Sequence, residues 1–440
     1  MPSDEASRDT IAAIATPAGR GGIGIVRLSG PRVPEIARTL LGALPPPRHA
    51  TFGAFRDRRG ELVDEGLALY FPAPHSYTGE PVLELHGHGG PVVMQALLSS
   101  CVDAGARLAE PGEFTKRAFL EGKLDLAQAE AVADVIDAAS REAARSALRS
   151  LTGEFSSRVG VIADSLIELR ALTEAILDFP EEEVDALHRD DAQARLAGIR
   201  LHLEELIAKS RQGSLLRNGI HVVIAGRPNV GKSSLLNRLA GEERAIVTPI
   251  AGTTRDALRE PIEIEGVPLV LVDTAGLRPA GDVLERLGIE RTQHELERAD
   301  VVLLVFEAGE QHAPVEGVPE GVTCLEVYNK IDLAPHFAAP AGAVAVSAKT
   351  GAGLEALRKA ILRAAGWTSS GESTFLARER HLRSLEEASR HLEAATRLVG
   401  EWELFAEELR LAHAALGRIT GEFTSDDLLG EIFSRFCIGK

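Results

Sequence analysis

The chain is poor in cysteine, aromatic residues and lysine. Its 440 residues include 3 Cys, 4% aromatic residues, and 8 Lys against 40 Arg. Three cysteines far apart in the sequence do not suggest a disulfide framework and are typical of a reducing cytoplasm. The chain also lacks a basic and apolar signal segment, and no apolar run approaches the about 18 residues that span a membrane. These absences argue against a secreted, disulfide-rich protein and predict a cytoplasmic one without a membrane anchor.

The charge balance is acidic, with a formal net charge of −17 and a hydrophobic fraction of 45%. A chain of this length is expected to hold two or three domains, and the hydrophobic fraction is sufficient for sizeable cores. An acidic protein does not bind nucleic acid through bulk electrostatics. Any RNA contact therefore needs a local patch or a basic partner.

A phosphate-binding motif indicates the class of protein. Residues 226–233 read Gly-Arg-Pro-Asn-Val-Gly-Lys-Ser, between an apolar strand pattern at 220–225 and a helical pattern at 234–239. In a loop of the form G-x-x-x-x-G-K-[ST], glycines let backbone N–H groups turn toward phosphates. Lys232 then supplies a cation to the β/γ oxygens and Ser233 a hydroxyl for Mg²⁺. The context predicts a P-loop.

Three further motifs follow in the order of a guanine-nucleotide domain. Asp-Thr-Ala-Gly at 273–276 ends a second apolar strand, where the carboxylate can hold the Mg²⁺ water shell and Gly276 can meet the γ-phosphate. Asn-Lys-Ile-Asp at 329–332 supplies a carboxylate for guanine N1–H and the exocyclic amine, a pair that adenine does not present. Ser-Ala-Lys at 347–349 offers backbone N–H groups to guanine O6. Together the motifs predict GTP rather than ATP.

The first switch, by position, covers residues 245–256, and Thr254 is expected to bring its hydroxyl to Mg²⁺. The predicted GTP-binding residues are Asn229, Val230, Gly231, Lys232, Ser233, Ser234, Thr248, Thr253, Thr254, Asp273, Thr274, Ala275, Gly276, Asn329, Lys330, Asp332, Ser347, Ala348 and Lys349.

The hydrolytic step lacks the glutamine of Ras-type enzymes, because Leu277 occupies its position and cannot hydrogen-bond a water. Hydrolysis must be slow or use another residue. Glu285 is a candidate for that role, and a solvated charge beside Arg286 is the alternative. Asn229 either stabilises its own loop or, with backbone carbonyls, holds a monovalent cation against the β/γ-phosphates.

The predicted fold is multidomain α/β and α, in four segments. Residues 1–120 read as an α+β domain, with strands at 11–15, 24–28, 66–71 and 82–86 and a helix at 91–104. Residues 121–218 read as a helical domain, helical at 124–179 with a break near Gly153 and again at 191–210. A Ras-like P-loop domain with a mostly parallel sheet flanked by helices covers 219–366. It interrupts the helical domain, which resumes at 367–440 and ends in Cys-Ile-Gly-Lys.

With these motifs in place, the chain resembles the tRNA-modification GTPase family MnmE, also called TrmE. The resemblance covers essentially the whole chain and includes Gly-Arg-Gly-Gly-Ile-Gly-Ile-Val-Arg at 19–27 and Leu-Glu-Leu-His-Gly-His-Gly-Gly-Pro at 83–91. Residues 111–130, Pro-Gly-Glu-Phe-Thr-Lys-Arg-Ala-Phe-Leu-Glu-Gly-Lys-Leu-Asp-Leu-Ala-Gln-Ala-Glu, are the most specific stretch. The terminal Phe-Cys-Ile-Gly-Lys at 436–440 also matches.

The resemblance implies a K⁺-activated GTPase cycle in which the nucleotide domains dimerise. The implied K⁺ ligands are the Asn229 side chain and the backbone of Thr248, Ile250 and Thr253. Mg²⁺ is implied at Ser233 and Thr254, and Glu285 is implied to position the hydrolytic water.

The resemblance further implies a homodimer whose N-terminal domain binds 5-formyltetrahydrofolate or a related one-carbon tetrahydrofolate. The matching positions are Arg27, Glu84, Lys123 and Lys440. Read without the resemblance, Glu84 is an ordinary strand residue on a solvated face. The family works with the flavoprotein MnmG, which carries FAD and uses NADH, in a heterotetramer or larger complex. Together they install an aminomethyl or carboxymethylaminomethyl group at C5 of the wobble uridine, position 34, of certain tRNAs.

Other readings stay open from the residues alone. Cys437 is either a reactive thiol near the folate or the end of a docked tail. A ribosome-associated GTPase of the Era/Der type should carry a basic RNA-binding appendage, and the appendages here are acidic. A membrane-assembling mechanical GTPase should carry a basic amphipathic helix, and none is found in the sequence.

Overall fold

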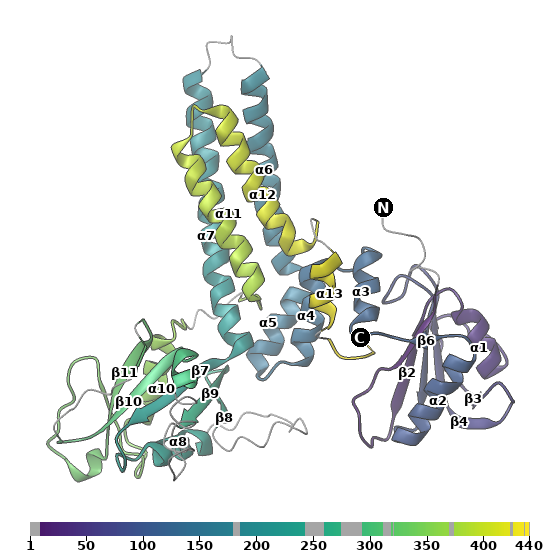
Figure 1. The fold of residues 1–440 in the computed structure, drawn as a ribbon, viewed down its shortest axis with the longest axis horizontal. Coiled ribbons are helices and arrows are strands. Elements are labelled where there is room, and N and C mark those ends of the chain that lie inside the picture. Colours follow the sequence, from purple (N-terminus) through teal and green to yellow (C-terminus); the bar gives the residue numbers. More distant parts are fainter. Residues whose placement is uncertain are drawn as a thin grey trace. The chain divides into compact units, whose positions relative to one another are not determined.

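The computed structural model describes residues 9–178, 185–242, 259–273, 293–310, 318–319, 321–368, 374–422, 426–434 and 436–439. The chain divides into two compact units (Figure 1). The N-terminal unit comprises residues 1–133 with 417–440, and the second unit comprises residues 134–416.

A six-stranded sheet forms the frame of the N-terminal unit, with strand order β3-β4-β5-β2-β1-β6. Its strands are β1 Ile11–Ile14, β2 Gly24–Ser29, β3 Thr51–Arg56, β4 Leu62–Phe71, β5 Val82–Gly87 and β6 Arg107–Leu108. All neighbouring pairs are antiparallel except β1 and β6, which run parallel. The predicted strands are confirmed, although β4 begins four residues earlier than the expected position 66. β3 was not predicted, since Gly53 interrupts its apolar pattern.

In the described part of this unit, the helices that belong to it wholly or largely are α1 Val33–Leu41, α2 Pro91–Asp103, α3 Glu113–Leu120, α4 Leu126–Ile136 and α13 Asp426–Ser434. α1 and α2 pack on the sheet through a core that includes Ile36, Leu40, Met94 and Leu97. The end of the chain joins this unit, because Phe433 and Phe436 are buried in one cluster with Leu126 of α4. The C-terminal tail is therefore part of the structure around the N-terminal sheet.

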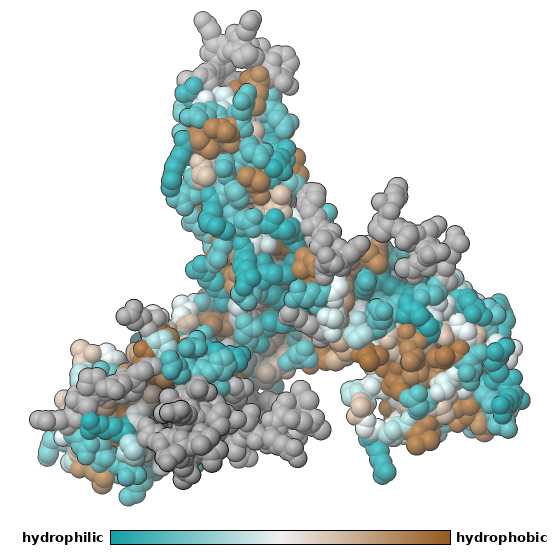
Figure 2. Space-filling model, in the orientation of Figure 1, coloured by the Kyte–Doolittle hydropathy of each residue, from teal (hydrophilic) through white to brown (hydrophobic). Residues whose placement is uncertain are grey.

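The second unit contains a helical part and a sheet part. The helices of the first are α5 Arg141–Leu151, α6 Glu154–Asp178, α7 Asp185–Asn218, α11 Glu379–Arg397 and most of α12 Trp402–Thr420. α7 packs along both α6 and α11 (Figure 1). Hydrophilic residues dominate the visible surface of these helices in Figure 2, and large exposed apolar side chains such as Val161, Ile167 and Leu201 are scattered. Among the described residues, no helix is both long and apolar enough to cross a membrane.

Two helix predictions need correction. The helical stretch predicted at 124–179 has a second break before α5, because Ser140 adopts an extended backbone and caps α5 with its hydroxyl, 3.1 Å from the Ala143 N–H. α7 also continues past the predicted end at 210, through Gly213 to Asn218, and stops where Gly219 takes φ +71°. Glycine is a weak helix former, so Gly213 reads as a helix end in the sequence although tertiary contacts keep it helical.

The sheet part of the second unit has strand order β12-β11-β10-β7-β9-β8. Its strands are β7 Ile220–Gly226, β8 Arg259–Ile264, β9 Val267–Asp273, β10 Val301–Glu307, β11 Thr323–Asn329 and β12 Val344–Ala345. Helices beside it include α8 Lys232–Glu242 and α10 Leu354–Ala364, and residues 293–297 are also helical. Every pair is parallel except β8 with β9. Because the faces of parallel sheets are covered, β7 and β9 are apolar along almost their whole length.

Candidate functional site

The P-loop follows β7 at the carboxyl end of the parallel sheet, where ligands bind in open α/β sheets. Gly226 has φ +153°, and a Cβ there would lie 2.4 Å from the Val305 carbonyl oxygen. Gly231 has φ +93°, and a Cβ there would lie 2.4 Å from Nδ2 of Asn329. Both positions therefore need glycine for backbone conformation and for space. Asn229 has φ +67°, a conformation that asparagine tolerates better than most residues.

Lys232 and Ser233 open α8 directly after the loop. The Lys232 ammonium donates to the carbonyl oxygens of Gly226 at 2.9 Å and Arg227 at 2.8 Å, so it is held within the P-loop. The Ser233 hydroxyl donates to the Asp273 carboxylate at 2.6 Å. A hydroxyl and a carboxylate thus meet beside a helix N-terminus, which suits a hard cation next to phosphate oxygens.

Asn329 joins the P-loop to the loop after β12. Its buried side chain donates from Nδ2 to the Val230 carbonyl oxygen at 2.9 Å and accepts from the Ala348 N–H at 3.0 Å. The asparagine therefore braces the phosphate side of the site against the loop of residues 347–349.

Asp332 lies just after the end of β11, where the Ser347 hydroxyl donates to its carboxylate at 2.6 Å. Lys330 has φ +66° and pairs with Glu307. Sequence reasoning missed Glu307. The feature that could have identified Glu307 is its position at the end of β10, directly opposite Asn329 in the strand register. The structure thus brings the P-loop, Asp273 and the Asn329–Asp332 and Ser347–Lys349 motifs to one edge of one sheet.

Several predicted residues lie outside the described part of the chain. They are Thr248, Ile250, Thr253, Thr254, Thr274, Ala275, Gly276, Glu285 and Lys440.

A second polar centre lies in the N-terminal unit, around Arg27 of β2. Its Nε and Nη2 atoms both lie 2.9 Å from Oε1 of Glu84 on β5, the residue directly opposite in the strand register. Nη1 donates to the Gly439 carbonyl oxygen at 3.4 Å, and His86 lies 3.2 Å from Oε2 of Glu84. Arg27 and Glu84, predicted as one site, are thus direct partners.

Aromatic side chains and the end of the chain complete this centre. The Arg27 guanidinium lies 5.6 Å from the ring centre of Tyr77 and 5.8 Å from that of Phe114. The Cys437 carbonyl oxygen accepts from the Gly112 N–H at 3.4 Å, and the Cys437 residue is exposed. Lys123 is exposed and donates its backbone N–H to Ala118 at the end of α3.

The two histidines of the His-Gly-His stretch face different carboxylates. His86 contacts Glu84, whereas His88 lies 2.7 Å from Oδ1 of Asp64 on β4. Within the described residues, no group of three or more His, Cys, Asp or Glu side chains is arranged to hold a metal ion.

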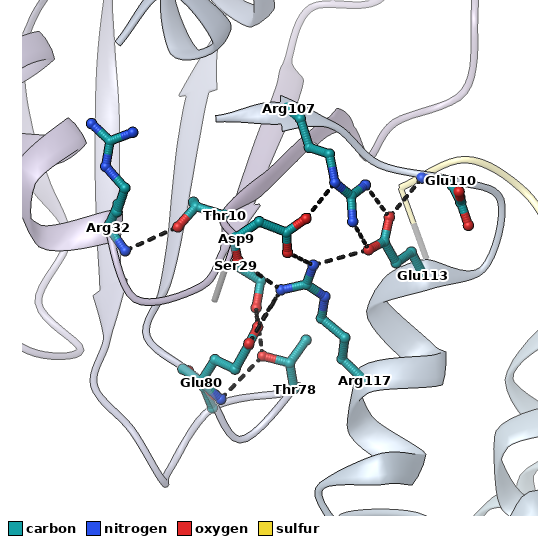
Figure 3. Close-up of polar contacts among 11 residues, drawn as sticks. Asp9, Thr10, Ser29, Arg32, Thr78, Glu80, Arg107, Glu110, Glu113 and Arg117 are labelled. Atoms are coloured by element: carbon teal, nitrogen blue, oxygen red, sulfur yellow. Dashed lines mark hydrogen bonds and ion pairs between the residues drawn. The ribbon is translucent and has the colours of Figure 1, made fainter. Parts of the chain in front are cut away.

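An ion-pair network with a buried centre at Arg117 and Glu113 holds α3 in the N-terminal unit (Figure 3). Arg117 of α3 donates to Asp9 at 2.7 Å, Glu113 at 2.9 Å and Glu80 at 3.1 Å. Arg107 donates to Glu113 at 2.6 Å. Five charged groups from the N-terminal segment, the segment before β5, β6 and α3 are therefore mutually paired.

The network shifts the acidity of its central carboxyl. Burial by itself raises the pKa of Glu113, but hydrogen bonds from Arg107, the Glu110 N–H and Arg117 outweigh it and hold that pKa at about 2. Glu113 is thus ionised across the physiological range.

The fold and the first site define a class: a P-loop GTPase domain whose chain enters from α7 and returns to α11. The family description "GTP-binding protein TrmE N-terminus" matches residues 10–123, and "MnmE helical domain" matches residues 126–437.

Two curated relatives, both called tRNA modification GTPase MnmE, are similar along almost their entire length. The relative from Azoarcus sp. (strain BH72) is 61% identical over 443 residues, and the one from Thiobacillus denitrificans is 58% identical over 437. In both cases the match covers 98% of each chain. Among solved structures, the G domain of the T. maritima FeoB iron transporter is 25% identical. It covers 33% of this chain and 98% of its own, at a TM-score of 0.24. The chain belongs to the tRNA modification GTPase MnmE family.

Proposed function

We propose that this chain is a K⁺-activated GTP hydrolase that modifies the wobble uridine of tRNA together with a flavoprotein partner. The reaction installs a (carboxymethyl)aminomethyl group at C5 of uridine 34 in certain tRNAs, with a one-carbon tetrahydrofolate as carbon donor. The observation that carries the proposal is the 61% identity over 98% of the chain to a relative with that name. The nucleotide-site geometry supports the GTPase half of the proposal independently.

In the proposed nucleotide site, Lys232 turns from the P-loop carbonyls to the β/γ-phosphate oxygens. Asp332, already oriented by Ser347, accepts two N–H groups of guanine. Mg²⁺, when bound, neutralises phosphate charge. Ser233 is assigned as its ligand together with Thr254, and the 2.6 Å contact between Ser233 and Asp273 fits that role.

K⁺ is assigned to the Asn229 side chain with the backbone of Thr248, Ile250 and Thr253. The positive charge of K⁺ then stabilises the negative charge that develops on the phosphate oxygens, as an arginine finger does in other GTPases. The positive φ of Asn229 supports a special role for this residue in the loop. Glu285 is assigned to position the attacking water, because Leu277 offers no hydrogen-bonding group.

Steady-state GTP hydrolysis should depend on the monovalent cation. In buffers of matched ionic strength, we expect the hydrolysis rate in K⁺ to exceed that in Na⁺ by about 10-fold or more. Groups that stabilise charge in a transition state typically change the rate by at least this factor. Asn229→Ala should remove most of that difference, whereas Asn218→Ala, outside the P-loop, should leave it in place. Equal wild-type rates in K⁺ and Na⁺ would leave the GTPase assignment standing and remove the cation site.

The folate site is proposed around Arg27, with Glu84, Lys123 and Lys440. A carboxylate such as Glu84 can accept the N–H and amine edge of a pterin, and a guanidinium can pair with a carboxylate of the glutamate tail. The enclosure of Arg27 between Glu84 and the ring of Tyr77 supports a recognition site. Cys437 is proposed to lie close to the bound folate.

Arg27→Ala should weaken binding of 5-formyltetrahydrofolate by about 10- to 100-fold, because hydrogen bonds to charged groups contribute about 1.5–3 kcal/mol. Isothermal titration of the full-length protein measures the affinity, and GTP hydrolysis measured on the same sample should be unchanged. Arg38→Ala, which removes an exposed arginine from α1, is the matched control. Unchanged folate affinity in Arg27→Ala would contradict the site.

The remaining proposals concern assembly. We propose a cytoplasmic homodimer formed through the N-terminal folate-binding domain (residues 1–120), followed by the helical domain (121–218 and 367–440) that holds the GTPase domain (219–366). Figure 2 shows hydrophobic surface on the N-terminal unit. The exposed apolar side chains of this unit include Ile23, Phe52, Leu67 and Val92. Phe52 and Leu67 are cross-strand partners. Exposed apolar neighbours such as this pair support a protein interface.

A further inference from the structure

The junction between the GTPase sheet and the helices is built around one buried carboxylate, Asp134 near the end of α4. Nε of Arg217, in the last turn of α7, donates to Oδ1 of Asp134 at 2.9 Å. Nη2 of Arg378, the residue before α11, donates to the same oxygen at 2.9 Å. The Asp134 side chain is 6% exposed, so both bonds end on a buried carboxylate.

These two arginines mark where the chain enters and leaves the GTPase domain. Arg217 stands three residues before β7, the strand that leads into the P-loop. Arg378 ends the segment that returns from α10. Asp134 therefore ties the incoming and outgoing crossings to each other and to α4.

Close backbone packing reinforces the same junction. A Cβ on Gly213 of α7 would lie 1.5 Å from the Phe375 carbonyl oxygen, so the returning segment crosses α7 in direct backbone contact. Phe375 is fully buried, with its ring centre 6.0 Å from that of Phe155 on α6. Leu376 joins the apolar core that also contains Ile220 and Leu269 of the GTPase sheet. Within the described residues, the two crossings are therefore packed together at Gly213, Phe375 and Leu376.

A second contact reaches the side of the sheet that ends in the nucleotide site. The Ser140 hydroxyl, which caps α5, donates to the Gly266 carbonyl oxygen at 2.6 Å in the turn between β8 and β9. β9 runs from this turn to Asp273, the partner of Ser233. β9 therefore links the nucleotide site at one end to the first turn of α5 at the other, so a shift of this strand can reach α5.

We propose that Asp134 is a positioning residue that couples the nucleotide state to the helices. By holding Arg217 and Arg378 together, it keeps the end of α7 and the start of α11 at a fixed separation beside the GTPase sheet. Movement of β9 must then be transmitted through the Ser140–Gly266 contact to α5 and its neighbours. One test of this inference, the rate of tRNA modification, rests on the proposed function. The other test, amide hydrogen exchange, does not.

The test compares Asp134→Asn with the wild-type full-length protein. Asparagine keeps the shape of the side chain and an acceptor oxygen but removes the charge shared by the two arginines. Asp137→Asn, an exposed carboxylate three residues further on, is the matched control. Amide hydrogen exchange is followed with GDP and with a non-hydrolysable GTP analogue in K⁺ buffer, alongside GTP hydrolysis and modification of tRNA with the flavoprotein.

In the wild type and Asp137→Asn, exchange in α5 and in residues 374–378 should change between the two nucleotides by at least about 5-fold, the lower end of typical allosteric coupling. In Asp134→Asn that dependence should disappear, while the P-loop amides keep theirs. GTP hydrolysis should stay within about 2-fold of wild type and tRNA modification should fall about 10-fold or more.

Ser140→Gly provides a second variant if Asp134→Asn does not fold. Glycine is a good helix cap, so α5 should lose only a few tenths of a kcal/mol of stability, while the bond to Gly266 is removed. Like Asp134→Asn, Ser140→Gly should abolish the nucleotide dependence of hydrogen exchange in α5.

Three results would overturn the inference. They are a wild-type α5 insensitive to the nucleotide, unchanged sensitivity in both variants, or a loss of P-loop sensitivity in parallel with that of α5. If the exchange results are as expected but even the wild type modifies no tRNA, the coupling is supported and the proposed function fails.

Discussion

Asp332→Asn is expected to lower GTP affinity by about 100-fold or more and to raise the affinity for xanthosine triphosphate. The carboxylate is assigned two charge-assisted hydrogen bonds from guanine, each contributing about 1.5–3 kcal/mol. Xanthine presents a carbonyl where guanine carries its amine, so the asparagine amide can donate to it. The Ser347 hydroxyl, 2.6 Å from the Asp332 carboxylate, already orients this side chain. The asparagine amide is therefore expected to occupy the position of the carboxylate.

Titration with fluorescent analogues of both nucleotides measures this exchange of specificity. The gain for xanthosine triphosphate distinguishes a change in recognition from a damaged fold, since a misfolded domain would lose both ligands. Glu355→Gln, which removes an exposed carboxylate from α10, should bind GTP like the wild type. Wild-type GTP affinity in Asp332→Asn, with no gain for the xanthine nucleotide, would show that the base lies elsewhere.

Arg117→Met is expected to destabilise the N-terminal unit by about 3–5 kcal/mol, because it removes the cation that the largely buried carboxylates of Glu113 and Glu80 share. Arg117 contacts Asp9, Glu80 and Glu113 and is itself buried (Figure 3). Methionine is apolar and comparably long, so lost charge pairing dominates over a cavity. Hydrogen exchange of β2 and β5 amides reports the opening of this unit specifically, whereas both tryptophans, Trp367 and Trp402, lie in the other unit.

The stability of the N-terminal unit should fall as the pH falls, because the pKa of Glu113 is lowered in the folded state. Glu113 has a folded pKa of about 2, below its ordinary value of 4.5. Its contribution is therefore fully present above about pH 4.5 and is lost as the pH falls from there toward 2. Arg117→Met removes one of the donors that lower this pKa, so the loss of stability over the same window should be smaller than in the wild type.

Arg32→Met is the matched control for both measurements. Arg32 is a neighbouring arginine whose Glu35 partner is exposed, and surface pairs of this kind contribute about 0–1 kcal/mol. Equal stability losses in Arg32→Met and Arg117→Met would refute the view that the buried network holds this unit together.

The nucleotide site could be predicted from the sequence because its parts are local. A P-loop is a strand, a glycine-rich turn and a helix start in direct succession, and Lys232 and Ser233 act from fixed positions within it. The same holds for Asp332 beyond its strand. Glu307 was missed because its partner Lys330 directly follows the neighbouring strand β11. The strand register, which places Glu307 opposite Asn329, brings the two together, and no sequence motif does.

The sequence by itself determined the class of the protein, the order of its segments, and the residues that define the nucleotide motifs. Only the tertiary structure decided that α7 runs through Gly213, that residues 417–440 belong with the N-terminal unit, and that Asp134 joins Arg217 to Arg378. The physical reason is the range of the interactions. Motifs and helical periodicity act over a few neighbouring residues, whereas burial, backbone crossings and shared ion pairs join positions more than 80 residues apart, a separation that no local pattern encodes.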